Sequence, residues 1–119
     1  MRDQSITLPF TVPNLVGGFA EGRGLAKVSP SELILEFVVK ETVLEVFKSD
    51  MKEIHIPRAE VDVVQFKRGW FGAKVRIRLK SMKWLADLPG CDNGEVTLHV
   101  ARRERDQAAE FVQLLRQIP

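Results

Sequence analysis

The residues most able to do chemistry are two histidines, His55 and His99, and one cysteine, Cys91. A metal site would need more histidine, cysteine or clustered carboxylate ligands at suitable spacing. Nucleophilic catalysis needs a nucleophile, a base and an orienting group in contact, and no motif frames such a set. Asp92 also disfavours a thiolate at Cys91, because a nearby anion opposes the charged form.

A glycine-rich segment runs from Gly17 to Gly24. A phosphate-binding loop of the P-loop type needs Gly-Lys-Ser/Thr between a strand and a helix. Here the lysine and the hydroxyl are missing, and residues 25–28 continue a strand pattern. We therefore expect these glycines to serve turns or close backbone approach, and we expect no enzyme, no metal site and no cofactor.

An aromatic pair between glycines, ringed by cations, is the sharpest candidate for binding. Its members are Lys67, Arg68, Trp70, Phe71 and Lys74. We expect Trp70 and Phe71 to be packed, near Trp84 or in a subunit interface, because large aromatic side chains are more often buried than exposed. The alternative is that they insert into a membrane interface while the cations meet anionic headgroups.

Next to this pair, apolar residues alternate with cations in the period of a half-buried strand. The cations of this row are Lys74, Arg76, Arg78 and Lys80. Three interpretations are open: a solvated face with partners such as Glu60 and Asp62, protection of an edge strand, or an anionic partner. Nucleic acid is the weakest choice of partner, because no aromatic side chain shares the cationic face.

Composition sets wider bounds. The chain has 119 residues, one-domain length, with 18 Lys and Arg against 16 Asp and Glu. The net charge of +2 is too small to indicate a nucleic-acid binder by itself. Pro9 and Pro13 interrupt the only run that could resemble a signal peptide, and no run approaches the ~18–20 apolar residues of a membrane span. We expect a cytoplasmic protein.

The strands that position these residues are predicted from the alternation of apolar and polar residues along the chain. Strands are predicted over residues 19–28, 33–40, 42–48, 52–56, 60–67, 73–80 and 95–101, with residues 69–72 as a hairpin tip. A parity change after Val63 indicates either a β-bulge or a strand that is apolar on both faces. Because of Pro9 and Pro13, residues 1–18 are predicted to be an extended arm outside a single domain of residues 19–119.

Residues 104–118 carry helical spacing, and strands followed by one helix favour an α+β fold. We predict a mainly β domain, a strongly bent antiparallel sheet or partial barrel of about seven strands, capped by the C-terminal helix. Phe111, Val112 and Leu115 are its expected plug.

The chain resembles the bacterial pleckstrin-homology-like family. The likeness is carried by strand order over residues 19–118, by residues 54–61, and by residues 94–101 leading into 105–111. It implies a superfold that hosts lipid, peptide and protein binders. Residues 29–32, Ser-Pro-Ser-Glu, replace the cationic loop that lipid-binding members often carry between their first two strands.

We therefore expect a non-enzymatic binding or assembly module, most consistent with protein binding or self-association as a homo-oligomer. An exposed strand edge or the tip would dock into the partner. The alternative is a peripheral binder of anionic lipid that uses the tip and the cationic row.

Overall fold

The computed structural model describes residues 5–15, 20–41, 46–47, 51–85 and 94–116. Over these residues, the secondary structure comprises eight strands, three short 3₁₀ turns and one α-helix. The strands are β1 (Ile6–Leu15), β2 (Ala20–Val28), β3 (Glu32–Glu41), β4 (Val46–Phe47), β5 (Lys52–Pro57), β6 (Val61–Arg68), β7 (Gly72–Leu79) and β8 (Glu95–Ala101). The 3₁₀ turns are η2 (Arg58–Glu60), η3 (Met82–Leu85) and η4 (Arg102–Glu104), and the helix is α1 (Arg105–Leu115).

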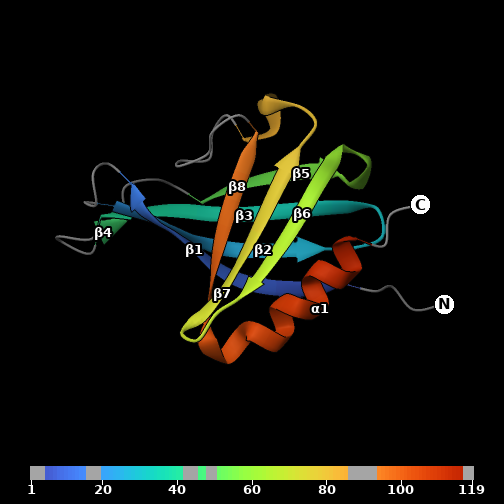
Figure 1. The fold of residues 1–119 in the computed structure, drawn as a ribbon. Coiled ribbons are helices and arrows are strands. Elements are labelled where there is room, and N and C mark those ends of the chain that lie inside the picture. The colour runs from blue at the N-terminus through green and yellow to red at the C-terminus, as the bar shows by residue number, and fades with distance from the viewer. Residues whose placement is uncertain (1–4, 16–19, 42–45, 48–50, 86–93, 117–119) are drawn as a thin grey trace.

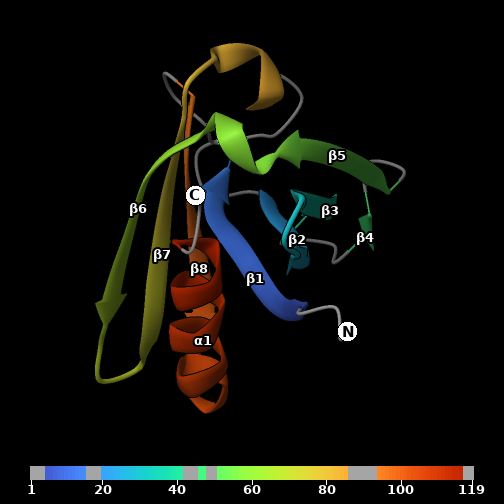
Figure 2. The ribbon, with the colours of Figure 1, turned by 90° about the vertical axis from the view of Figure 1, so that its right-hand side faces the viewer.

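All pairings in the sheet are antiparallel, in the order β4-β3-β2-β1-β8-β7-β6, with β5 also paired to β3. β1 and β8 pair at one register position, Thr11 opposite His99. At this seam the sheet bends, so that β6–β8 cross β1–β3 as a second layer (Figure 1). Figure 2 shows α1 between the lower ends of the two layers. The predicted mainly β fold with a C-terminal helical cap is confirmed.

The prediction of an extended arm is wrong for the described part of residues 1–18. β1 lies inside the sheet, between β2 and β8. Pro13 is tolerated because it falls in the interval between Val12 and Leu15 where the register with β2 shifts. On the β8 side the only register partner is at Thr11, so few ladder bonds are lost there.

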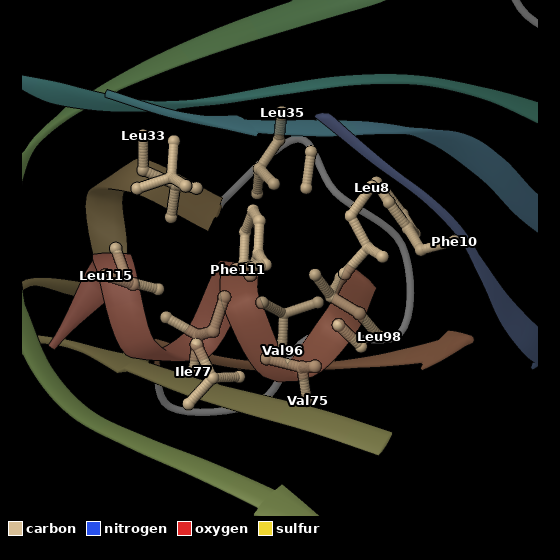
Figure 3. Packing of buried hydrophobic residues seen from close by; sticks show 14 of the residues in the cluster. Leu8, Phe10, Leu33, Leu35, Val75, Ile77, Val96, Leu98, Phe111 and Leu115 are labelled. Atoms are coloured by element: carbon tan, nitrogen blue, oxygen red, sulfur yellow. The ribbon is translucent and has the colours of Figure 1, made fainter. Parts of the chain in front are cut away.

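The core fills the space between the two layers and α1. Alternate residues of β1, β3, β7 and β8 point inward, and Figure 3 shows Phe111 among them. Phe111, Val112 and Leu115 are all buried, which confirms the predicted plug. The bulge is also confirmed, as a register shift between Val61 and Val63.

A buried arginine closes the end where α1 terminates. The Arg58 guanidinium donates to the carbonyl oxygens of Leu114 (2.7 Å), Leu115 (3.1 Å) and Ser29 (3.1 Å). The last carbonyls of a helix lack partners within the helix, so Arg58 supplies donors they would otherwise miss. Burial lowers the pKa of Arg58, although a guanidinium remains charged at neutral pH.

Candidate functional site

The hairpin tip between β6 and β7 exposes its two aromatic side chains. Trp70 is 75% exposed and Phe71 84%. The expectation that they pack is therefore wrong for the single chain. β6 and β7 pair regularly as far as Arg68 opposite Ala73, and the Gly69 N–H donates to the Gly72 carbonyl at 2.7 Å. The tight loop projects both rings beyond the last register pair, where no layer covers them.

Gly72 allows this tip to lie close to β8. A Cβ at Gly72 would stand 2.4 Å from the carbonyl oxygen of Val100, a separation that real side chains do not adopt. At Gly69 the nearest atom, the Gly72 carbonyl oxygen, would be 3.2 Å away. Glycine is therefore required at the β7 end of the loop and is far less constrained at the β6 end.

The start of α1 holds the tip in place (Figures 1 and 2). Arg105 Nη1 donates to the Gly69 carbonyl at 2.8 Å, and Arg68 Nη2 lies 2.7 Å from Asp106 Oδ1. The hydrogen bond from Arg68 lowers the pKa of Asp106. The Arg102 guanidinium lies 6.0 Å from the centroid of the Trp70 ring, at the outer limit of a cation–π contact. The rings are thus presented on a backbone fixed from a second element.

Cations from four elements surround the tip. They come from β6, β7, η4 and α1, namely Lys67, Arg68, Lys74, Arg102 and Arg105. The described carboxylates of η4 and the first turn of α1 are both ion-paired: Glu104 with Arg103 at 3.6 Å and Asp106 with Arg68 at 2.7 Å. Positive charge therefore dominates this end. Arg102 and Arg105 could not be assigned to this site from the sequence, because only the fold brings them back to the tip.

The cationic row of β7 is exposed and alternates with buried residues, as predicted. Its edge-strand interpretation is wrong, because β7 pairs with both β6 and β8. Arg76 bonds Glu95 of β8 at 2.7 Å, in place of the expected partners Glu60 and Asp62. Glu60 instead accepts from the Trp84 indole N–H at 3.0 Å.

The other cations of the row differ from Arg76. These cations are Lys74, Arg78 and Lys80. Across the described residues, none of the three has a carboxylate oxygen within 4.0 Å. Lys80 lies one residue beyond the end of β7.

A hollow of about 390 Å³ lies beside the tip. Its lining includes Trp70, Phe71, Lys67, Lys74 and His99. Lys67, Lys74 and His99 stand at facing register positions on β6, β7 and β8, so they form one row across the sheet. Burial first, and then the charge of Lys74, lower the pKa of His99, which keeps its imidazole neutral at pH 7.

Part of this row was readable from the sequence. A hairpin with a two-residue loop at Trp70 and Phe71 places Lys67 opposite Lys74 by counting alone. Both lysines were predicted as candidate binding residues, but not as a facing pair. His99 gave no such signal, because its place depends on the β7–β8 register, and residues 80–94 separate these strands.

Three further features bear on the chemistry of the chain: a metal site, the lone cysteine and a membrane-spanning helix. Residues 5–15, 20–41, 46–47, 51–85 and 94–116 contain no group of three or more histidine, cysteine, aspartate or glutamate side chains that could hold a metal. Cys91 lies outside these residues. Within the same ranges, no helix has the length and apolar character that a bilayer span requires. No protein-family model matches the chain, and no curated protein or solved structure is found to be similar to it.

Proposed function

We propose that this domain is a non-enzymatic module that docks peripherally on an anionic membrane surface. Trp70 and Phe71 enter the interfacial region, and the surrounding lysines and arginines meet lipid headgroups. The observation that carries the proposal is the exposure of both aromatic rings at a point where cations from four elements converge.

The physical chemistry of an interface suits this arrangement. Tryptophan favours the boundary between headgroups and acyl chains, because its ring is apolar and its N–H is polar. Each cation near an anionic surface contributes about 1 kcal/mol. The hydrogen bond from Arg105 and the ion pair of Arg68 with Asp106 fix the tip before it binds. Less conformational entropy is then lost on docking.

The fold is compatible with this role. The bent antiparallel sheet with α1 at its open end agrees with the pleckstrin-homology-like topology that the sequence resembles, and we infer membership of that superfold. The predicted cytoplasmic location would place the tip against the inner leaflet, whose surface potential is negative. Function still rests on the tip, because the superfold hosts several kinds of binder.

Protein binding or self-association is the second candidate, and the same exposed rings support it, since tryptophan is a frequent anchor of protein interfaces. The exposed apolar area of the tip is small for a stable protein interface. Two exposed aromatic side chains offer on the order of 300 Å², whereas a stable interface buries about 800 Å² on each partner. The tip alone is therefore better matched to a membrane than to a stable dimer.

Vesicle flotation tests the proposal. Wild type should float with anionic vesicles and not with neutral ones, and rising salt should weaken binding. Trp70→Ala/Phe71→Ala should bind at least about 100-fold more weakly, because burying each ring contributes roughly 1.5–3 kcal/mol. Met82→Ala is the matched control, since Met82 is also exposed but lies at the other end of β7.

Absence of wild-type flotation under every condition would contradict membrane docking. Light scattering on the same samples would then test self-association. A mass above that of the monomer, returned to the monomer by the double substitution, would support the second candidate.

A further inference from the structure

We propose that the hollow beside the tip binds the phosphate monoester of a lipid headgroup, held by Lys67, Lys74 and His99. The inference rests on the proposed membrane docking and adds the chemical class of lipid. It starts from one observation: three nitrogen-bearing side chains share a register row, and that row lines a hollow of about 390 Å³.

The lysine pair is the first argument. Lys67 and Lys74 face each other across β6 and β7, which sets their Cβ atoms ~5 Å apart, and like charges directly opposite each other destabilise a sheet. Neither has a carboxylate oxygen within 4.0 Å in the described part of the chain. An anion between the two ammonium groups would remove this repulsion.

The neighbouring rows show that the sheet elsewhere avoids such a pair. One row away, Arg76 faces Gln65 and bonds Glu95. In the next row, Arg78 faces Val63 on one side and Glu95 on the other. Two facing cations occur only in the row beside the tip, among the β6–β7 register pairs.

The chemistry of the row favours a monoester over a diester. A phosphate monoester carries about −1.5 to −2 charge near neutral pH and offers three acceptor oxygens, which match two ammonium groups and one further donor. His99 can supply that donor. Its neutral imidazole offers one N–H without adding charge to the row. A diester has a single charge and would leave one lysine uncompensated.

The position of the hollow ties this phosphate to a lipid. Trp70 and Phe71 line the same hollow as the three polar side chains. When the rings enter the interface, the row lies at headgroup depth, with apolar walls toward the acyl chains. For a soluble phosphate ester, two exposed rings at the rim of the site would contribute nothing to binding.

The experiment compares two vesicle types of equal surface potential, one containing phosphatidic acid and the other phosphatidylglycerol, with phosphatidylcholine as the matrix. Wild type should prefer phosphatidic acid by about tenfold, because charge-assisted hydrogen bonds to a second phosphate charge are strong. Lys67→Gln/Lys74→Gln should bind both vesicle types equally. Arg78→Gln/Lys80→Gln is the matched control, which removes the same charge ~13–20 Å further along the chain and should keep the preference.

Each other outcome is decisive. Equal wild-type binding to both vesicle types would overturn the phosphate site and leave membrane docking in place, whereas no binding to either would remove docking as well. Calorimetric titration with glycerol 3-phosphate separates the sources of phosphate. Weak binding that requires Lys67 and Lys74 supports the proposal. Binding as tight as that to phosphatidic acid vesicles, unchanged in Trp70→Ala/Phe71→Ala, would overturn the lipid assignment.

Discussion

Trp84 and Trp70 lie beyond opposite ends of β7, and their surroundings differ. The Trp84 indole N–H donates to Glu60 at 3.0 Å, the Lys83 ammonium lies 4.8 Å from its ring centroid, and its ring packs against the core. Trp70 is 75% exposed, and the Arg102 guanidinium lies 6.0 Å from its ring centroid. We call these the closed end (Arg58, Glu60 and Trp84) and the tip end (residues 68–72 with 102–106).

The difference separates stability from binding. At the closed end, side-chain donors bond within the fold: Arg58 donates to three main-chain carbonyls and Trp84 donates to Glu60. At the tip end, the polar contacts fix the backbone of the loop and leave the two rings in solvent. Substitutions at the closed end should therefore reduce stability and spare vesicle binding, and ring substitutions at the tip should do the reverse.

The largest expected effect is at Arg58. Arg58→Met should lower the free energy of unfolding by about 3 kcal/mol, because it removes the side-chain donors to the buried carbonyls of Leu114 and Leu115 and to the part-buried carbonyl of Ser29. Urea denaturation measures the loss. Arg105→Gln is the matched control at the tip end, where the side chain is only partly buried, and a loss well under 1 kcal/mol is expected. Equal losses of unfolding free energy in the two variants would contradict the proposed difference between the closed end and the tip end.

The second prediction uses the two glycines of the loop. Gly72→Ala should destabilise the domain by about 2 kcal/mol, because its Cβ must displace the Val100 carbonyl from 2.4 Å. It should also weaken vesicle binding, since β7 would move away from β8 and carry the tip with it. Gly69→Ala should cost less, because its nearest atom lies at 3.2 Å. Thermal denaturation ranks the pair, and an equal loss at both positions would contradict the argument.

The sequence predicted the strands, the bulge and the helix because each depends on local periodicity. It failed at residues 6–15, where two prolines favoured an arm. Their tolerance depends on a seam with β8 at which only Thr11 is paired, and no local pattern reveals that seam. It also failed on the exposure of Trp70 and Phe71. Burial of a two-residue loop depends on what the distant start of α1 covers, and that segment contacts the backbone of the loop more than its rings.

The third prediction compares the tryptophans directly. Trp84→Phe should cost about 1 kcal/mol, because it removes the N–H that Glu60 accepts at the closed end. Trp70→Phe should leave the free energy of unfolding within about 0.5 kcal/mol of wild type, as expected for an exposed position. Chemical denaturation of the two variants decides this. A loss at Trp70→Phe equal to that at Trp84→Phe would mean that the tip is packed in solution.

The smallest expected effects are titrations of opposite sign. His55 hydrogen-bonds Glu32 at 3.0 Å and also contacts Glu53, and these bonds raise its pKa above 6.5. Its contribution to stability is therefore complete below pH 6.5 and is lost as pH rises through the folded pKa. At the tip end, the bond from Arg68 lowers the pKa of Asp106 below 3.8. Its contribution is present above pH 3.8 and is lost as pH falls through the folded pKa.

Denaturation midpoints measured across pH separate the two sites. His55→Gln should flatten the decline of stability on the alkaline side of pH 6.5 and leave the acid side unchanged. Asp106→Asn should flatten only the acid side. Asp106→Asn should also loosen the tip and weaken vesicle binding slightly, since Arg68 loses its anchor on α1, whereas His55→Gln should leave vesicle binding unchanged. Weaker vesicle binding in His55→Gln would show that β5 and the tip are coupled and would contradict the predicted independence of stability and binding.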